Sequence, residues 1–232
     1  MGIPERKERE KEQRREEIIN SAQRVFFEKG LAAATMDEIA ERVELSKSTL
    51  YLYYKSKEDL YVAVTLRGLE IMYNMFTKAL STGEPTIQLI SDLGEAYHNF
   101  FKAHRDYFRM FYFLENSRLH TQVSDEMKEL CLTSDKKVWS LVIDLIQRGI
   151  DEGMLHKGID PREAAVMLWS NSNGLMRLMD REDGYWKEHM GIDLESTLRR
   201  SNAFLVEGMM TDRAKKEFGS VLIYHEQDKK GN

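Results

Sequence analysis

The sequence has little cysteine, little proline and no long apolar run. A single cysteine, Cys131, excludes an intramolecular disulfide and a zinc site built from several cysteines. No apolar stretch approaches the ~18 residues of a membrane span. The first residues alternate basic and acidic side chains and contain no apolar signal region. From these absences we expect a cytoplasmic protein.

Low proline and glycine content leaves room for long helices. The 232 residues include 3 prolines and 14 glycines, and 42% of the chain is hydrophobic, which is enough for a real core. We therefore predict an all-α fold. The formal net charge of −5 means that the protein as a whole repels polyanions. Any nucleic-acid binding must then rest on a local patch of basic and hydrogen-bonding side chains.

Motifs of the common enzyme classes are missing. A di-iron helical bundle needs two Glu-x-x-His pairs, and the chain has one, formed by Glu95 and His98. The sequence contains no H-E-x-x-H, no G-x-x-x-x-G-K-[ST] and no G-x-S-x-G. We predict no catalytic residue, no metal ligand and no cofactor, and we keep a di-iron enzyme only as an unfavoured alternative.

The N-terminal sixty residues carry the signals of three closely spaced helices. Apolar residues with helical spacing begin at Ile18, and Gly30 stands where a glycine would end the first helix. Thr35 opens a capping box with Glu38, and Ser46 is the next N-cap. Short helices this close together are stable only when packed against one another, and their spacing is that of a helix-turn-helix.

The almost entirely charged segment 5–17 precedes this pattern. We interpret it as a solvated, frayed extension of the first helix, and a functional tail is the less favoured alternative. The predicted domains are a helix-turn-helix domain over 1–56, whose residues 1–13 are the charged part, and a larger helical domain over 57–225. Residues 226–232 are predicted to be a disordered tail.

Longer helices are predicted after the helix-turn-helix. Capping residues and apolar spacing place them at about 57–81, 85–103, 125–152, 160–180 and 193–210. A dense aromatic block separates the second of these helices from the third. We find no repeat of fixed period and no low-complexity linker.

The segment 45–57 has the chemistry of a phosphate-binding surface. It contains three lysines and no acidic residue, together with several serine, threonine and tyrosine hydroxyl groups. A helix beginning after Ser46 would add free backbone N–H groups and a partial positive charge. The same residues are also compatible with half-buried tyrosines and an ordinary solvated face.

A longer motif in this region resembles a known family. Residues 35–60 read TMDEIAERVELSKSTLYLYYKSKEDL. They closely resemble the DNA-binding signature of TetR-family transcriptional regulators, T-x-x-x-I-A-x-x-A-G-V-S-x-G-T-L-Y-x-Y-F-x-S-K-E-x-L. With the Phe26-x-x-x-Gly30 ending of the first helix, the resemblance covers about residues 14–62.

The resemblance implies a role for each matching residue. The predicted DNA-binding residues are Thr35, Ser46, Lys47, Ser48, Thr49, Tyr51, Leu52, Tyr53, Lys55 and Lys57. Among them, Lys47, Ser48 and Thr49 would lead the recognition helix toward base edges. Tyr51, Tyr53 and Lys57 would contact phosphates, whereas Leu50 and Tyr54 would be buried.

Three residues depart from the family pattern. Glu44 replaces the usual glycine of the turn, and if that position has positive φ the replacement costs about 1 kcal/mol. Ser48 replaces a common glycine, which either holds the helix off the DNA or adds a donor. Leu52 is apolar where a groove-facing side chain is expected, and we predict that it touches a thymine methyl group.

The resemblance also implies a ligand cavity and a dimer face in the larger domain. The predicted dimer-interface residues are Met167, Asn171, Leu175, Leu178, Phe204, Leu205 and Met209. The predicted ligand-pocket residues are Phe100, Tyr107, Phe108, Phe111, Tyr112, Trp139, Trp169 and Arg109. Both sets could instead belong to the intramolecular core, and Arg109 could be a surface cation.

Together these patterns predict a ligand-responsive repressor. The expected partners are a palindromic double-stranded DNA operator, a second copy of the chain and a small, largely apolar or aromatic effector. A single short recognition helix makes few contacts, so we expect a homodimer on half-sites about 34–36 Å apart or a multiple of that. A helical adaptor that no longer binds DNA, as Glu44 would allow, remains the alternative.

Overall fold

The computed structural model describes residues 3–114, 121–181 and 184–219. These residues form α-helices joined by turns, and within them the only β-type pairing is an isolated bridge between Leu155 and Met210. The predicted all-α fold is therefore confirmed. No helix in these ranges is long and apolar enough to cross a membrane. The predicted tail 226–232 lies outside the described residues.

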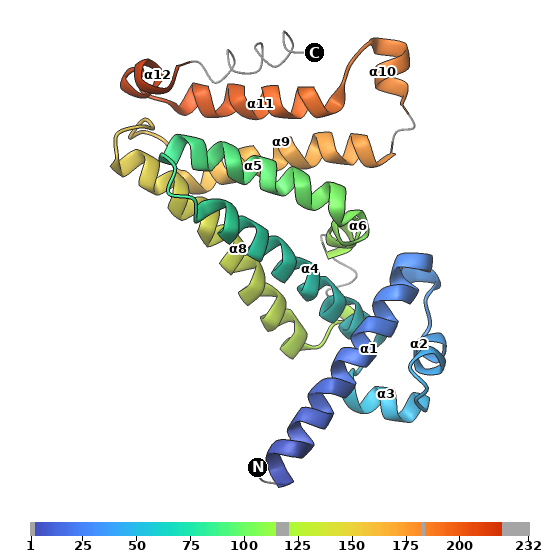
Figure 1. Ribbon diagram of the computed structural model, residues 1–232. Coiled ribbons are helices and arrows are strands. Elements are labelled where there is room, and N and C mark those ends of the chain that lie inside the picture. Colours follow the sequence, from blue (N-terminus) through green and yellow to red (C-terminus); the bar gives the residue numbers. More distant parts are fainter. Residues whose placement is uncertain (1–2, 115–120, 182–183, 220–232) are drawn as a thin grey trace. The chain divides into compact units, whose positions relative to one another are not determined.

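The chain divides into two compact units, and its helices are labelled in Figure 1. The first unit contains residues 1–71 and 106–135, and the second contains 72–105 and 136–232. The helices are α1 (Ile3–Ala33), α2 (Met36–Arg42), α3 (Lys47–Tyr53), α4 (Lys57–Leu80), α5 (Thr86–Ala103), α6 (Arg105–Leu114), α8 (Asp125–Asp151), α9 (Pro161–Arg181), α10 (Tyr185–Met190), α11 (Leu194–Met209) and α12 (Asp212–Phe218).

The capping residues of the sequence begin the helices of the first unit. Thr35 and Glu38 form a complete capping box at the start of α2. The Ser46 hydroxyl accepts the Thr49 N–H at 3.1 Å and so begins α3. The Ser56 hydroxyl accepts the Asp59 N–H at 3.0 Å at the start of α4. Each cap satisfies a backbone donor that the first turn leaves without a partner.

The core of the first unit lies where α1, α2 and α3 meet. Ile18, Ile39 and Leu50, one from each helix, are fully buried. Phe26 of α1 packs edge-to-face on Tyr61 of α4, with ring centroids 5.1 Å apart. Neither α2 nor α3 is long enough to be stable alone, so this shared core holds both short helices in place.

Helix α6 joins the first unit through two tyrosines. The Tyr61 hydroxyl donates to the Met110 carbonyl at 3.2 Å, and the Tyr107 hydroxyl donates to Gln23 at 2.8 Å. The Tyr107 ring lies directly over Gly68, where an added Cβ would meet ring atom Cδ1 at 2.6 Å. The aromatic block predicted from the sequence thus reaches back to the N-terminal helices.

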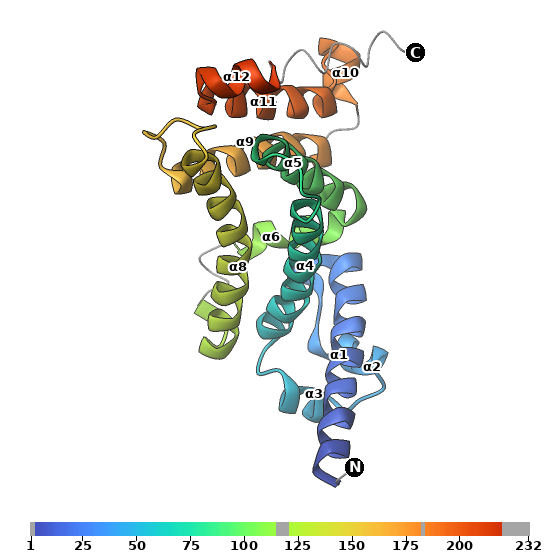
Figure 2. The same cartoon turned by 60° about the vertical axis from the view of Figure 1, so that its left-hand side comes forward.

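Helices α5, α9 and α11 pack together in the second unit (Figure 2). The Tyr97 hydroxyl of α5 donates to Asn173 of α9 at 2.9 Å. Asn202 of α11 exchanges hydrogen bonds with Ser172 and accepts one from Asn171 at 2.7 Å. These polar contacts fix the register of α9 against its two neighbours.

Candidate nucleic-acid interface

Helix α3 is held by one buried side chain and exposes most of the others. Leu50 is fully buried, whereas Tyr51 and Leu52 are 44% and 85% exposed. At its start, the Ser46 hydroxyl also lies 2.8 Å from the Ser48 hydroxyl and 2.7 Å from that of Thr49. The helix therefore presents a hydroxyl-rich N-terminal turn and an apolar tip to its surroundings.

The ten residues predicted to bind DNA all lie in the first unit, on α3, at the start of α4 or in the adjoining caps and turns. Seven of them are exposed: Thr35, Ser46, Lys47, Ser48, Tyr51, Leu52 and Lys55. The remaining three, Thr49, Tyr53 and Lys57, are partly buried. Their roles toward DNA stay predictions.

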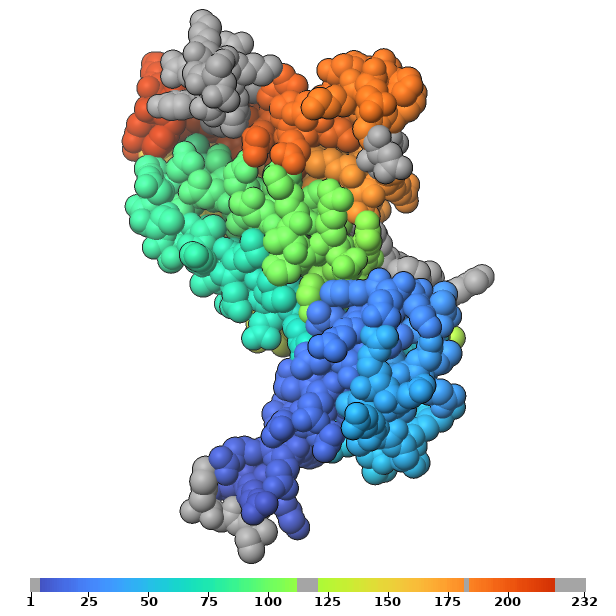
Figure 3. Space-filling view, turned by 45° about the vertical axis from the view of Figure 1, so that its right-hand side comes forward, coloured from blue at the N-terminus to red at the C-terminus, as the bar shows by residue number. Residues whose placement is uncertain are grey.

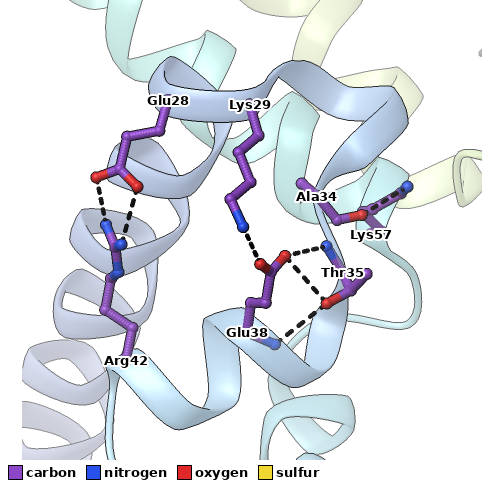
Figure 4. A network of polar contacts seen from close by, with 7 residues as sticks. All are labelled: Glu28, Lys29, Ala34, Thr35, Glu38, Arg42 and Lys57. Carbon is purple, nitrogen blue, oxygen red and sulfur yellow. Dashed lines mark hydrogen bonds and ion pairs between the residues drawn. The ribbon is translucent and has the colours of Figure 1, made fainter.

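Thr35 and Lys57 take part in a polar network around the end of α1 (Figure 4). The Thr35 hydroxyl accepts the Glu38 N–H and donates to the Glu38 carboxylate, which also pairs with Lys29. The hydrogen bond from Lys29 lowers the pKa of the Glu38 carboxyl. The Lys57 ammonium donates to the Ala34 carbonyl at 2.9 Å. Lys57 thereby ties the start of α4 to the chain that precedes α2.

A second ion pair in Figure 4 links α1 to α2. The two terminal guanidinium nitrogens of Arg42, Nη1 and Nη2, donate to the Glu28 carboxylate at 2.7 and 2.9 Å. These hydrogen bonds lower the pKa of the Glu28 carboxyl. Sequence reasoning did not identify this pair because the partners lie 14 residues apart and belong to no capping motif.

Lys47 is bound to a neighbouring carboxylate. Its ammonium donates to Asp37 of α2 at 2.9 Å, which raises the pKa of Lys47. Both side chains are more than half exposed, and such surface pairs contribute about 0–1 kcal/mol. The ammonium can therefore exchange Asp37 for a phosphate oxygen at little cost. Asp37 is a residue of this surface that the sequence pattern did not reveal.

Glu44 adopts the left-handed conformation that its position in the turn suggested. Its φ is 57°, and it has the only positive φ of any non-glycine in the described ranges. The Glu44 N–H donates to the Glu41 carbonyl, and the Leu45 N–H donates to the Ala40 carbonyl, which closes the turn between α2 and α3. The side chain is exposed.

Tyr54 is the C-cap residue of α3 and is partly buried. Burial raises the pKa of its hydroxyl to about 12, and Arg15 of α1 partly opposes this increase. Of the two residues that the resemblance assigned to packing, Leu50 is therefore fully buried and Tyr54 partly buried.

The residues predicted to line a ligand pocket fall into both units. Tyr107, Phe108, Phe111 and Arg109 belong to the first, and Phe100, Trp139 and Trp169 belong to the second. Phe100, Tyr107 and Phe108 are buried, and the exposed Arg109 pairs with Asp106. Trp139 and Trp169 meet edge-to-face at 5.7 Å. The Tyr112 side chain lies outside the described residues.

The residues predicted for a dimer interface lie on α9 and α11. Met167 and Phe204 are 55% and 61% exposed. Asn171 donates to Ser201 and Asn202, so it already links the two helices within one chain. Leu175, Leu178, Leu205 and Met209 are partly buried. The described residues contain no group of three metal-binding side chains.

Comparison with known proteins identifies this arrangement. Residues 18–64, which include α2, α3 and the buried half of α1, match the family of bacterial regulatory proteins described as the tetR family. Residues 18–64 are a TetR-family helix-turn-helix domain. The curated relatives of the chain are named as transcriptional regulators, in agreement with the prediction that it is not an enzyme.

Two curated relatives extend beyond the helix-turn-helix. The chain is 31% identical over 145 residues to the transcriptional activator FasR of Mycolicibacterium smegmatis, covering 62% of this chain and 63% of FasR. It is 25% identical over 147 residues to the transcriptional repressor KstR2 of the same species, covering 63% of this chain and 70% of KstR2. The alignment thus spans less than two thirds of FasR.

A solved structure shows the same fold over most of the chain. The regulator FadR from Bacillus subtilis, in complex with stearoyl-CoA, superimposes with a TM-score of 0.63. The match covers 83% of this chain and 98% of FadR, at 17% sequence identity. At that identity the likeness concerns the fold. The arrangement of a TetR-type helix-turn-helix followed by a larger helical region is therefore confirmed.

Proposed function

We propose that this chain is a sequence-specific DNA-binding repressor that acts in the cytoplasm as a homodimer on a palindromic operator. The observation that carries the proposal is the exposed, Ser46-capped helix α3 inside the segment that matches the family. A helix of this length fits the major groove, and its N-terminal hydroxyl groups and backbone N–H groups suit base edges and phosphates.

Lysines and hydroxyl groups beside α3 supply the sequence-independent part of the interaction. Lys47 and Lys55 are exposed, and so is Thr35, the N-cap residue of α2. Each cation that neutralises a phosphate releases counterions, so binding should weaken steeply as salt rises. This local chemistry offsets the repulsion expected from the net charge of −5.

We further propose that a small, largely apolar or aromatic ligand releases the repressor from DNA. Support comes from the many aromatic side chains of the middle of the chain, including the paired Trp139 and Trp169. The relatives differ in the sign of regulation, since FasR is named an activator and KstR2 a repressor. Repression, the usual mode of the family, is our proposal for this chain.

Selection of bound duplexes from a random DNA pool tests the proposal directly. We expect recovery of an inverted repeat whose binding weakens with salt, and loss of that binding with some members of a panel of apolar and aromatic compounds. A chain that ignores all duplex DNA at low salt would instead be a helical adaptor. A selected sequence without two-fold symmetry would contradict the dimeric mode.

A further inference from the structure

The N-terminal part of α1 extends beyond the core as an exposed helix. Its first buried side chain is Ile18, and residues 5–14 are exposed. Because an α-helix rises 1.5 Å per residue, Lys7 lies about 16 Å along the axis from Ile18. We call residues 5–15 the N-terminal arm. In Figures 1 and 2 the arm continues past the end of α3 within the first unit, and Figure 3 shows it projecting into solvent.

One face of the arm is basic. Lys7, Lys11 and Arg14 follow one another at spacings of four and three residues, which places them on one stripe of the helix. The same spacing continues through Ile18, Ala22 and Val25, which are at most 2% exposed. The basic stripe is therefore a direct extension of the face that packs on the rest of the first unit.

The acidic residues of the arm lie mainly on another face. Glu5, Glu8 and Glu12 recur at spacings of three and four residues, offset from the basic stripe. Glu12 pairs with Arg15, which is outside the stripe. The arm is thus a helix whose charges are partly segregated, and its six basic residues outnumber its four acidic ones.

The cations of the stripe are available to a partner. Within the described residues, no hydrogen bond or ion pair involves Lys7 or Lys11. Arg14 pairs with Glu17 at 2.7 Å, but both side chains are about 40% exposed, and a pair of this kind is exchanged for another anion at little cost.

The arm lies beside the end of α3 in the first unit. Burial is the largest influence on the pKa of Tyr54 at the end of α3, and Arg15, Glu12 and Glu16 of α1 also act on it electrostatically. A duplex seated on α3 would therefore pass close to the arm. The 16 Å of the arm corresponds to about five nucleotides of one strand at 3.4 Å each.

We propose that the N-terminal arm is an additional DNA-contacting element, in which Lys7, Lys11 and Arg14 bind phosphates of the duplex beside the half-site read by α3. The inference rests on the proposed DNA-binding function. It assigns the arm a contribution to affinity and none to base recognition, because flexible cations on an exposed helix meet backbone phosphates rather than base edges.

Salt-dependent binding of a triple variant tests the arm. Lys7→Gln, Lys11→Gln and Arg14→Gln keep helix-forming residues but remove three charges. With a selected duplex and an unrelated duplex, we expect the slope of log K against log salt to become shallower by about 2.7 for each arm engaged. When salt rises from 50 to 200 mM, the variant should therefore lose about 40-fold less affinity than the unaltered chain for each arm engaged. The ratio of the two affinities should not change.

Two further variants keep the result interpretable. A conservative triple, Lys7→Arg, Lys11→Arg and Arg14→Lys, should retain the full slope. Lys136→Gln, Lys215→Gln and Lys216→Gln remove the same charge from exposed positions of the second unit and should also leave the slope unchanged. Circular dichroism of each variant verifies that the helices persist.

The possible failures are distinguishable. If the unaltered chain bound duplex DNA and the arm variant had the same slope, the arm proposal alone would be overturned. An equal change in the second-unit variant, or an effect confined to the selected duplex, would also overturn it. If the unaltered chain bound no duplex at all, both the proposed function and the role of the arm would be wrong.

Discussion

Glu44 has a strained backbone conformation beside the helix that we propose binds DNA. It has φ 57° in the turn before α3, where the family pattern has glycine. A side chain in this conformation costs roughly 1–2 kcal/mol. Its side chain is exposed in the turn that leads into α3, the helix that we propose binds DNA. The backbone strain and the negative charge both disfavour glutamate at this position. Among the observed hydrogen bonds, none involves its carboxylate.

Replacing Glu44 should therefore change two measurable properties, the free energy of unfolding and the affinity for DNA. We expect Glu44→Gly to raise the free energy of unfolding by about 1 kcal/mol relative to Glu44→Ala, because glycine relieves the left-handed strain. Urea unfolding of the two variants measures this difference. Both variants lose the carboxylate, so both should bind DNA more tightly than the unaltered chain. Equal stability of the two variants would contradict the strain.

Leu52 is the most exposed large apolar side chain of the recognition helix, at 85%. If it touches a thymine methyl group, Leu52→Ala should lose about 1 kcal/mol of binding free energy at one A·T position of the operator. Affinities for operator variants substituted at each position measure this effect. Tyr51→Phe, which keeps the neighbouring ring, serves as the comparison. A uniform loss across all operator variants would contradict the predicted contact.

At the scale of the helices, local signals predicted most boundaries. The helices expected at 57–81 and 125–152 are observed at Lys57–Leu80 and Asp125–Asp151. Capping boxes and N-cap serines act within three or four residues, so they are visible in the sequence. The charged start of α1 is helical from Ile3, where the sequence alone suggested possible fraying.

Contacts between distant segments could not be predicted in the same way. The donation from Lys57 to Ala34, the pair of Lys47 with Asp37 and the position of Tyr107 over Gly68 join residues 10 to 39 positions apart. Such contacts depend on how the helices pack, which hydrophobic periodicity does not specify. The candidate DNA-binding residues were predictable because the motif itself names them, whereas their partners were not.

The burial of His98 between helices should make the free energy of unfolding depend on pH. It lies on α5, is 2% exposed, and stacks on Phe101 with ring centroids 6.4 Å apart. Neither ring nitrogen has a hydrogen-bond partner in the described part of the chain, and the Glu195 carboxylate of α11 lies 4.0 Å from Nε2. Burial lowers the pKa of His98, and the nearby Glu195 and Glu95 oppose this effect only in part.

The sign of the pH effect follows from this lowered pKa. In the unfolded chain His98 takes up a proton near its ordinary pKa of 6.5, whereas the folded chain does so only at lower pH. Between these values the unfolded state binds more protons, so the free energy of unfolding should fall as the pH decreases, by at most about 1.4 kcal/mol per pH unit. Urea unfolding between pH 8 and pH 5 measures this slope.

Substitution separates His98 from other titrating groups. His98→Leu should flatten the pH dependence below pH 6.5, and His156→Leu, which changes an exposed histidine of the same unit, should retain it. The lowered pKa values of Glu28 and Glu38 act only below their ordinary value of 4.5. A slope that persists in His98→Leu would show that another group is responsible.

At the scale of the whole molecule, exposed apolar side chains indicate where a second copy would pack. Met167, Trp169 and Phe204 are between 37% and 61% exposed on α9 and α11. Gly174 and Gly208 of the same helices have open space where a side chain would project. Small residues beside exposed apolar ones allow helices of two chains to approach closely.

A charge at this face should prevent association. We expect Phe204→Glu to convert a dimer into a monomer in sedimentation velocity, because burying an unpaired carboxylate costs several kcal/mol. DNA affinity should fall with the dimer, since each monomer reads one half-site. Leu132→Glu, at a 70% exposed leucine of α8, is the matched control and should remain dimeric. A dimeric Phe204→Glu variant would place the interface elsewhere.

The close fit of Tyr107 over Gly68 restricts the order in which this sequence can change over evolution. An added methyl group at position 68 would meet the ring at 2.6 Å, so even alanine is excluded while the tyrosine stays in place. A lineage can enlarge position 68 only after position 107 has become smaller. That first step also removes the hydroxyl group that donates to Gln23. Descendants with a larger residue at position 68 should therefore lack the tyrosine at position 107.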